Sequence, residues 1–549
     1  MLSASIGFSK SHDKLSGQRN RPADNVSTHP TSAVSGSRSL FSPGRQHSAF
    51  SATVLLMISS VLSGILGLVR TKYIAHVFGA GHVTDAYTAA FQLPDMISYF
   101  LVGGVASITL VNILTRFREA GDEAAADRAL SVILIAMTAV LSVCIVLAEI
   151  FAPLYTRVFF GKLDPATAAL CTHLTRLVLP AQLLFFAGGV LSSRLLVRKI
   201  FLYQAITPLI YNAGIILGGV LLASRMGIDA LAWGVLGGAL FGSLILNAFG
   251  AFRTGLRFHF IFNLRHPAFI EWLKLSLPLM IGVSLAMADK WILAHFAAAD
   301  TGGITLLNNA KTFFNAPLTV VGAAAGSASL PFFTTLFSQQ KLFDFNAAVN
   351  RSVSRLLAVA MLVTAWMAAL AIPIIGLLRG GVYTQHDALA TARYFALFSL
   401  SLALWSAQGI YARAFYAARN TLTPAISGTL VTLISIPIYG YFFHRHGLEG
   451  LAIASDIGIL MHTLALAVLL HRYRLVSLAC LDFGELARAA LAAAVAYLAA
   501  TAALTFLPTG AGYTGDLTQL AAATVVWAAA AAATLTVTRS RLLAQLRNR

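Results

Sequence analysis

Residues 51–69 read SATVLLMISSVLSGILGLV, nineteen positions without a charged side chain. An apolar run of about 18 or more residues is long enough to cross the hydrocarbon core of a membrane as a helix. Further apolar runs recur up to residue 538, without the polar and apolar alternation of a barrel strand. The sequence therefore predicts an all-α polytopic membrane protein with about fourteen transmembrane helices. The expected spans are 51–69, 86–114, 129–153, 170–193, 203–223, 228–251, 270–298, 304–336, 350–378, 389–417, 422–443, 448–470, 485–507 and 517–538.

The composition supports a membrane protein and argues against a nucleic-acid partner. Hydrophobic residues make up 58% of the chain and charged residues 11%, with a mean hydropathy of +0.76. Soluble domains carry about 25% charged residues. The net charge of +18 fits Lys and Arg in cytoplasmic loops, because no basic cluster lies on a soluble domain large enough to grip a duplex. The three cysteines form no CxxC pair, so we expect neither a disulfide framework nor a metal site.

The distribution of Lys and Arg predicts the orientation in the membrane. Residues 1–50 are polar and Ser-rich, as in a disordered cytoplasmic tail. With the N-terminus inside, 28 of the 39 Lys and Arg residues fall in cytoplasmic segments and nine fall outside. Cytoplasmic loops are enriched in these residues. We therefore expect a multi-pass protein of the bacterial inner membrane with both termini in the cytoplasm.

An internal repeat divides the chain into two halves. Met226-Gly-Ile-Asp-Ala-Leu-Ala232 resembles His446-Gly-Leu-Glu-Gly-Leu-Ala452, 220 residues later, and further matches occur at nearly the same offset. Six helices lie within one offset, so the two halves have the same orientation and an axis along the membrane normal. The expected parts are the tail 1–50, a six-helix bundle 51–252, a second six-helix bundle 270–470, and two additional helices in 485–538.

Ionisable residues within spans are costly and usually face a cavity or a partner, so they are the candidate site residues. Arg70 and Asp85 either face a central cavity or pair at a helix end. Lys311 is either a cation for an anionic head group or a snorkelling lysine. Asp289 either coordinates a coupling cation or proton or belongs to a structural ion-pair network. Asp456 lies within another span and is a second candidate for cation or proton coupling.

Helix-bending residues occur at matching places in the two halves. Pro94 precedes Gly103 by nine residues, and Pro317 precedes Gly326 by the same distance. Proline removes a backbone hydrogen bond and kinks a helix. These four residues are expected to let helices bend between two states, although a static kink would leave the same pattern.

Signals of an enzyme are missing from the sequence. It contains no HExxH, no GxSxG and no phosphate-binding GxxxxGK[ST] motif. No nucleotide-binding domain is evident, so ATP is not expected to drive transport directly. We therefore expect a transporter without a cofactor, with a sodium ion or a proton as the candidate coupling ion.

Four short motifs near the first two spans resemble the opening of the lipid II flippase family MurJ, formerly MviN, of the MOP superfamily. In this chain they read Leu66-Gly-Leu-Val-Arg70, Val77-Phe-Gly-Ala-Gly81, Thr84-Asp85-Ala86 and Ala90-Phe91-Gln-Leu-Pro94. Leu277-Pro-Leu-Met-Ile-Gly-Val-Ser284, Ser329-Leu-Pro331 and Asn420-Thr-Leu-Thr-Pro424 are also similar to later segments of that family.

The resemblance implies a fold of two six-helix bundles in a V, with two further helices that form a groove for a lipid tail. It implies that the chain flips the undecaprenyl-diphosphate-linked peptidoglycan precursor, lipid II, to the periplasmic face during cell-wall biogenesis. The family's essential arginine and aspartate fall on Arg70 and Asp85, which with Lys311 are the expected substrate-binding residues. Asp289 is the nearest match to an aspartate that binds sodium in some members. The cell-wall synthesis machinery is a further expected partner.

Three cavity arginines of the family are absent. Their places hold Gly64, Ser98 and Thr312, with Lys311 adjacent to the last. Arginine binds a diphosphate with two parallel hydrogen bonds, whereas lysine acts as a point charge. The alternatives to a lipid II flippase are therefore a flippase for another polyprenyl-diphosphate glycan, a cation-coupled multidrug exporter of the same superfamily, and a membrane scaffold without transport.

Overall fold

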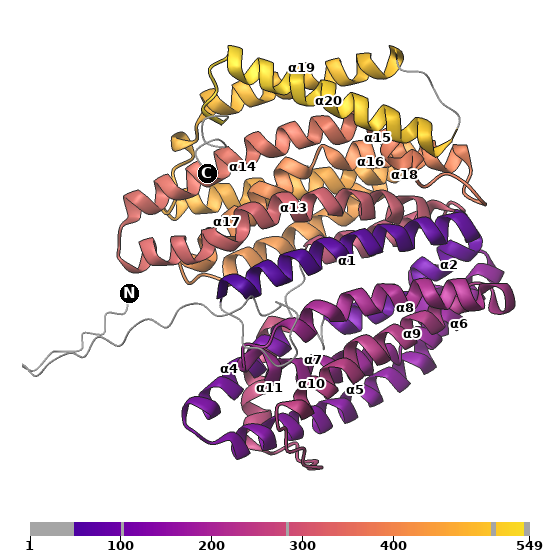
Figure 1. Ribbon diagram of the computed structural model, residues 1–549, viewed down its shortest axis with the longest axis vertical. Coiled ribbons are helices and arrows are strands. Elements are labelled where there is room, and N and C mark those ends of the chain that lie inside the picture. The colour runs from indigo at the N-terminus through magenta and orange to yellow at the C-terminus, as the bar shows by residue number, and fades with distance from the viewer. Residues whose placement is uncertain (1–48, 100–103, 281–284, 507–511, 543–549) are drawn as a thin grey trace, which may run out of the picture. The chain divides into compact units, whose positions relative to one another are not determined.

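The computed structural model describes residues 49–99, 104–280, 285–506 and 512–542, and every named element in these ranges is a helix (Figure 1). This confirms the predicted all-α fold. The helices of the first repeat are α1 (Ala49–Phe78), α2 (His82–Ala90), α3 (Gln92–Ile97), α4 (Gly104–Glu119), α5 (Glu123–Phe159), α6 (Pro165–Val178), α7 (Ala181–Val197), α8 (Leu202–Met226), α9 (Asp229–Gly238), the π-helix η2 (Ala239–Ile245) and α10 (Leu246–Arg253).

The remaining helices belong to the second repeat and the C-terminal pair. They are α11 (Pro267–Met280), α12 (Leu285–Ala297), α13 (Gly303–Ser338), α14 (Leu342–Ala369), α15 (Ala371–Gly376), α16 (Gln385–Ser399), α17 (Leu402–Ala417), α18 (Leu422–Arg472), the 3₁₀ helix η3 (Leu478–Cys480), α19 (Phe483–Phe506) and α20 (Tyr513–Val537).

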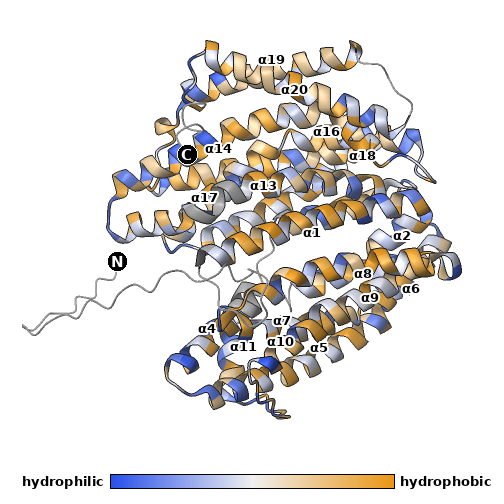
Figure 2. Cartoon of the chain, in the orientation of Figure 1, coloured by the Kyte–Doolittle hydropathy of each residue, from blue (hydrophilic) through white to orange (hydrophobic). Residues whose placement is uncertain are grey.

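The helices have the length and surface of membrane spans. Nine continuous helices in the described ranges are long and apolar enough to cross a membrane, and the bent pair α16 and α17 would make a tenth. Figure 2 shows apolar residues along most helices and hydrophilic residues mainly near their ends. One face of α5 exposes a stripe of large apolar side chains at Val143, Val146, Ile150, Leu154 and Val158. Such a stripe is costly in water and is expected against lipid, so this is a multi-pass membrane protein.

Helix α18 contains two of the predicted spans. Its 51 residues would measure about 77 Å as one straight helix, more than twice the thickness of a hydrocarbon core. The backbone turns inside it at Gly447, where φ is 55° and ψ is −137°. In the first repeat Gly227 ends α8 with φ 58° and ψ −135°. This backbone region is essentially restricted to glycine, so the same turn occurs in both halves, 220 residues apart.

An ion pair is duplicated at the same offset. Asp229 follows the Gly227 turn and lies 2.9 Å from His173 of α6. In the second half Glu449 follows Gly447 and lies 3.8 Å from Arg393 of α16. Donor and acceptor positions are both shifted by 220 residues. The predicted duplication therefore appears in the tertiary contacts as well as in the sequence.

The seventh predicted span connects the two repeats. Helix α11 packs against α4 and α5, and Arg116 of α4 makes two 2.7 Å hydrogen bonds to Glu271 of α11. Helix α12 instead packs against α13 and α18. Figure 1 shows α11 beside α4 and α10 of the first repeat. The expected second bundle 270–470 thus begins with a helix that contacts the first bundle, and the proposed division of the chain remains a prediction.

Helices α8 and α9 approach each other through glycines on both. A β-carbon at Gly218 of α8 would lie 2.6 Å from the Cα of Gly234, and one at Gly234 would lie 2.7 Å from the carbonyl oxygen of Gly214. Small residues at a spacing of four allow membrane helices to pack backbone against backbone. By contrast, a β-carbon at Gly237 would meet no atom within 4 Å.

This contact predicts different costs for two neighbouring substitutions in α9. Gly234→Leu should force α8 and α9 apart and lower the stability by about 1–3 kcal/mol, the usual cost of overpacking. Gly237→Leu is the matched control, because its side chain has space. Thermal unfolding of the purified protein in detergent measures both, and equal melting temperatures for the two variants would contradict the described packing.

Candidate functional site

A cavity of about 870 Å³ lies between the two repeats. Residues of α1 to α3 line one side, and residues of α12, α13 and α17 line the other. An adjoining cavity of about 220 Å³ shares Arg70, Asp95 and Lys290 with the larger one. Membrane transporters built from repeats commonly bind their substrate at the interface between the repeats, so this cavity is the candidate site.

The cavity lining has an internal symmetry. Several lining residues pair with a lining residue 220 positions later, the offset of the repeat. Both halves therefore present corresponding helix faces to the same space, which places the cavity at the axis between the repeats. The pairs are Arg70 with Lys290, Thr88 with Asn308, Gln92 with Thr312, Asp95 with Asn315, and Ser98 with Leu318.

Arg70 and Lys290 are the cations of the first of these pairs. Lys290 forms an ion pair with Asp95, which joins α12 of the second half to α3 of the first. Arg70 lines both cavities, and in the described part of the chain it has no hydrogen-bond or ion-pair partner. An arginine with free donors beside a cavity is well suited to bind an anion with two hydrogen bonds.

Lys290 and Asp95 were given no site role from the sequence. Both were recognised as charges within spans, but neither occurs in the motifs of the resembling family. The repeat offset was the signal that could have found Lys290, because it places this lysine opposite Arg70.

Lys311 and Asp289, both predicted site residues, form an ion pair at the edge of the cavity. The Lys311 ammonium lies 2.8 Å from Asp289 Oδ2 and donates a 2.9 Å hydrogen bond to Ser455. It also lies 4.2 Å from the centre of the Phe398 ring. The hydroxyl of Tyr439 donates to Asp289 Oδ1. Lys311 is therefore already neutralised by a partner in this structure.

Asp456, the second predicted coupling residue, belongs to the same cluster. It lies close enough to Lys311 and Asp289 to interact with both electrostatically. Its Oδ1 atom is buried and accepts no hydrogen bond from the described residues. The structure thus brings together Lys311, Asp289 and Asp456, which the sequence had placed on three different spans.

Asp85 lies elsewhere, at the start of α13. Its side chain is buried, is not part of the cavity lining, and accepts hydrogen bonds from the Gly302 nitrogen at 2.5 Å and the Thr305 nitrogen at 2.8 Å. The Thr305 hydroxyl also donates to it at 2.7 Å. A carboxylate at a helix N-terminus satisfies free N–H groups and interacts favourably with the helix dipole. Asp85 therefore caps α13 from the other half of the molecule.

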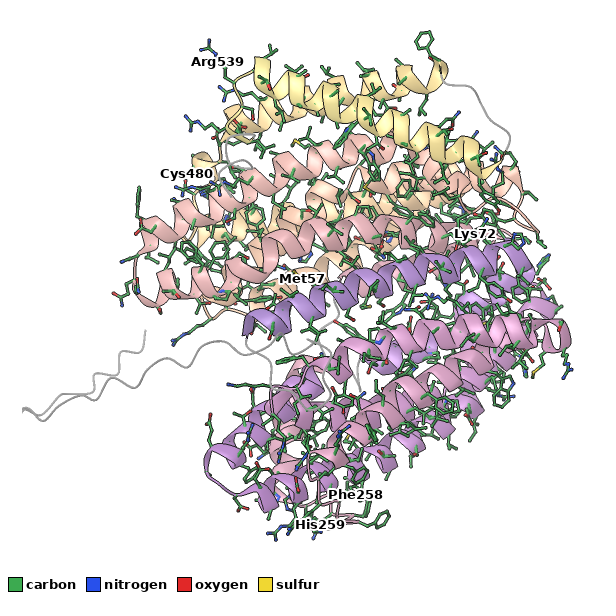
Figure 3. The ribbon with its side chains drawn as sticks, in the orientation of Figure 1. Met57, Lys72, Phe258, His259, Cys480 and Arg539 are labelled. Carbon is green, nitrogen blue, oxygen red and sulfur yellow. The ribbon has the colours of Figure 1, made fainter. Side chains whose placement is uncertain are left out.

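A second set of contacts holds the same end of the two halves together. The Lys72 ammonium of α1 donates to the carbonyl oxygens of Leu378 and Arg379 at 3.0 and 2.6 Å, and lies 2.6 Å from the Tyr513 hydroxyl of α20 (Figure 3). The backbone nitrogen of Val382 donates to the His76 carbonyl oxygen at 2.9 Å. The end of α1 is thus fixed to the turn 378–383 and to α20.

The predicted helix-bending residues have different surroundings. Pro94 lies in the first turn of α3, just after the break between α2 and α3 at Phe91. Pro317 and Gly326 lie within α13, which continues through both positions. Gly103 lies outside the described residues. The bending role of these residues remains a prediction.

The sequence and the fold were compared with known proteins. The family model described as "Lipid II flippase MurJ" matches residues 74–519. A probable lipid II flippase MurJ from Borreliella burgdorferi is 24% identical over 416 residues, which cover 75% of this chain and 81% of that protein. Among solved structures, the inward closed conformation of lipid II flippase MurJ matches with a TM-score of 0.73 at 22% identity, covering 88% of this chain and 99% of the other.

A second solved structure extends the likeness of the fold. An inward-facing multidrug resistance MATE family transporter of the MOP superfamily matches with a TM-score of 0.62 at 15% identity, covering 77% of this chain and 98% of the other. The structural likenesses show the fold, and the family model spans more than half of the sequence. The chain therefore belongs to the lipid II flippase MurJ family, whose members are transporters rather than enzymes.

Proposed function

We propose that this protein is a lipid II flippase that moves the undecaprenyl-diphosphate-linked precursor from the cytoplasmic to the periplasmic leaflet. Membership of the MurJ family supports this function. The structural observation that carries it is the unpaired Arg70 at a cavity between two repeats. A diphosphate is the part of lipid II that such a cation recognises.

The cavity would hold the diphosphate between the two halves. Arg70 supplies a planar group with free donors, and Lys290 faces the same space from the symmetry-related helix. Of the three positions where the family has arginine, Ser98 and Thr312 line the cavity as small uncharged residues. Lys290 and Lys311 offset part of this loss of positive charge. The cation set of one arginine and two lysines distinguishes this chain from the family pattern.

Closure at one end fits transport by alternating access. Asp85 and Lys72 hold the halves together at the end where α1 finishes and α13 begins. The Lys and Arg distribution assigns this end to the periplasmic side, with both termini in the cytoplasm and the protein in the bacterial inner membrane. Helices α19 and α20 pack against each other and against α14, and we propose that residues 485–538 accommodate the lipid tail.

The coupling ion is the part of the expectation that the site constrains most. Sodium at Asp289 does not fit the described arrangement, because Lys311 and Tyr439 donate to its two oxygens. We therefore do not assign sodium to this site. A proton remains as the proposed coupling ion, with Asp289 and Asp456 as the groups that would carry it.

Complementation tests the proposed function. The native lipid II flippase of a test bacterium is depleted, and this chain is expressed in its place. The parent should restore growth and periplasmic lipid II, whereas Arg70→Ala and Lys290→Ala should reduce rescue by about tenfold or more, the usual effect of losing a charged hydrogen bond. Arg225→Ala, at an exposed position away from the cavity, is the matched control. Full rescue by Arg70→Ala at equal protein level would contradict the role of Arg70.

The cap on α13 predicts a second outcome. Asp85→Ala leaves the Gly302 and Thr305 nitrogens without their acceptor, at a cost of about 1–3 kcal/mol to the closed state. A cysteine at Asn308, which lines both cavities, should then react faster with a membrane-impermeant maleimide from the periplasmic side. The native cysteines are first replaced. Asp85→Asn keeps one acceptor oxygen and should lie between the two, and an unchanged labelling rate in Asp85→Ala would rule out this closing role.

A further inference from the structure

The cluster around Lys311 occurs in one half of the molecule only. The cavity lining follows the repeat, but Asp289, Lys311, Tyr439 and Asp456 have no polar counterparts in the first half. The residues 220 positions earlier are Val69, Phe91, Gly219 and Leu236.

This asymmetry separates the cluster from the needs of the fold. The first half builds corresponding spans with apolar residues at the same repeat positions. Replacing a buried ion pair with apolar residues is often neutral or stabilising, because taking charges out of water is costly. The fold alone therefore does not explain why the second half keeps two carboxylates and a lysine there.

Lys311 lies where it can exchange partners. Its side chain lines the cavity yet is only 16% exposed, and it holds Asp289, whose side chain is 7% exposed. Lysine is a point charge on a flexible four-carbon stem, so its ammonium can turn without movement of the helix. A diphosphate in the cavity would compete with Asp289 for this ammonium.

Removing the ammonium would leave an excess of negative charge. The charged and titratable groups that face Asp289 are Lys311 from α13 and Tyr439 and Asp456 from α18, with Lys290 next to it in α12. Lys290 is engaged by Asp95. Two carboxylates buried near each other without a cation cannot both remain ionised. The cluster must therefore gain a positive charge when Lys311 leaves.

We propose that Lys311 is a tethered counter-ion that the diphosphate of the substrate draws away from Asp289 and Asp456, and that these carboxylates take up one proton in its place. The exchange couples substrate binding to proton uptake. It rests on the proposed function, because it requires a diphosphate in the cavity.

The pair of Lys290 and Asp95 provides an internal contrast. It also lies in the cavity, but its side chains are 39% and 36% exposed. An exposed carboxylate can stay ionised in water after its lysine leaves. Exchange of Lys290 should therefore strengthen substrate binding without proton uptake.

Titration calorimetry on the full-length protein in detergent tests the proposal. Undecaprenyl diphosphate is titrated near neutral pH into buffers with different ionisation enthalpies, and the dependence of the binding heat on the buffer gives the number of protons taken up. The parent should take up about one proton per diphosphate bound. Lys311→Met should bind about tenfold more weakly or worse and take up none.

Two further variants make the result specific. Lys290→Met should also bind more weakly but should keep the proton uptake. The double variant Asp289→Asn with Lys311→Met removes both partners of the buried pair. It should fold even if Lys311→Met alone does not, because no uncompensated charge is left at Asp289, and it too should take up no proton.

The opposing outcomes are distinct. Binding by the parent without proton uptake overturns the exchange and leaves the proposed function standing. Uptake that persists in the double variant, or affinity that instead depends on sodium, also overturns it. No binding of undecaprenyl diphosphate by the parent overturns the proposed substrate and the exchange together.

Discussion

The cap that Asp85 places on α13 is the contact on which the described state depends. The first N–H groups of a helix have no partner within it, and inside a membrane protein water is scarce. Here the acceptor comes from α2, in the other half of the molecule. Together with Lys72 and the turn 378–383, this cap joins the two repeats at one end. An interaction that satisfies a helix terminus in this way is stable only while the two halves are together.

Much of the fold could be predicted because its determinants are local. The length and polarity of the apolar runs predict the helices, and Gly227 and Gly447 mark the same turn because few other residues adopt it. The ion pair of Asp229 and His173 could not be foreseen, since the two residues lie 56 positions apart on different helices. Its counterpart in the second half became visible only when both partners were seen in space.

The site was predicted less completely, for a physical reason. A carboxylate at the start of a span has the same sequence signature whether it faces a cavity or a neighbouring helix terminus, and Asp85 does the latter. Lys311 was correctly recognised as a costly charge, but its pairing with Asp289 depends on how α12 and α13 pack. The role of Asp95 depends on the break at Phe91, which sets the direction in which α3 presents its side chains.

The substitution of lysines for arginines has a consequence for transport. A flippase must bind its substrate and also release it, so its site cannot hold the substrate too tightly. Of the three cavity cations, Arg70 is unpaired, whereas Lys290 and Lys311 each hold a carboxylate. A diphosphate would gain two lysines only by breaking these pairs, and the pairs would form again as it leaves. The cavity thus attracts an anion through one free cation and limits its affinity through two paired ones. Its lining follows the repeat, but these charges do not, so the two halves respond differently to the same substrate.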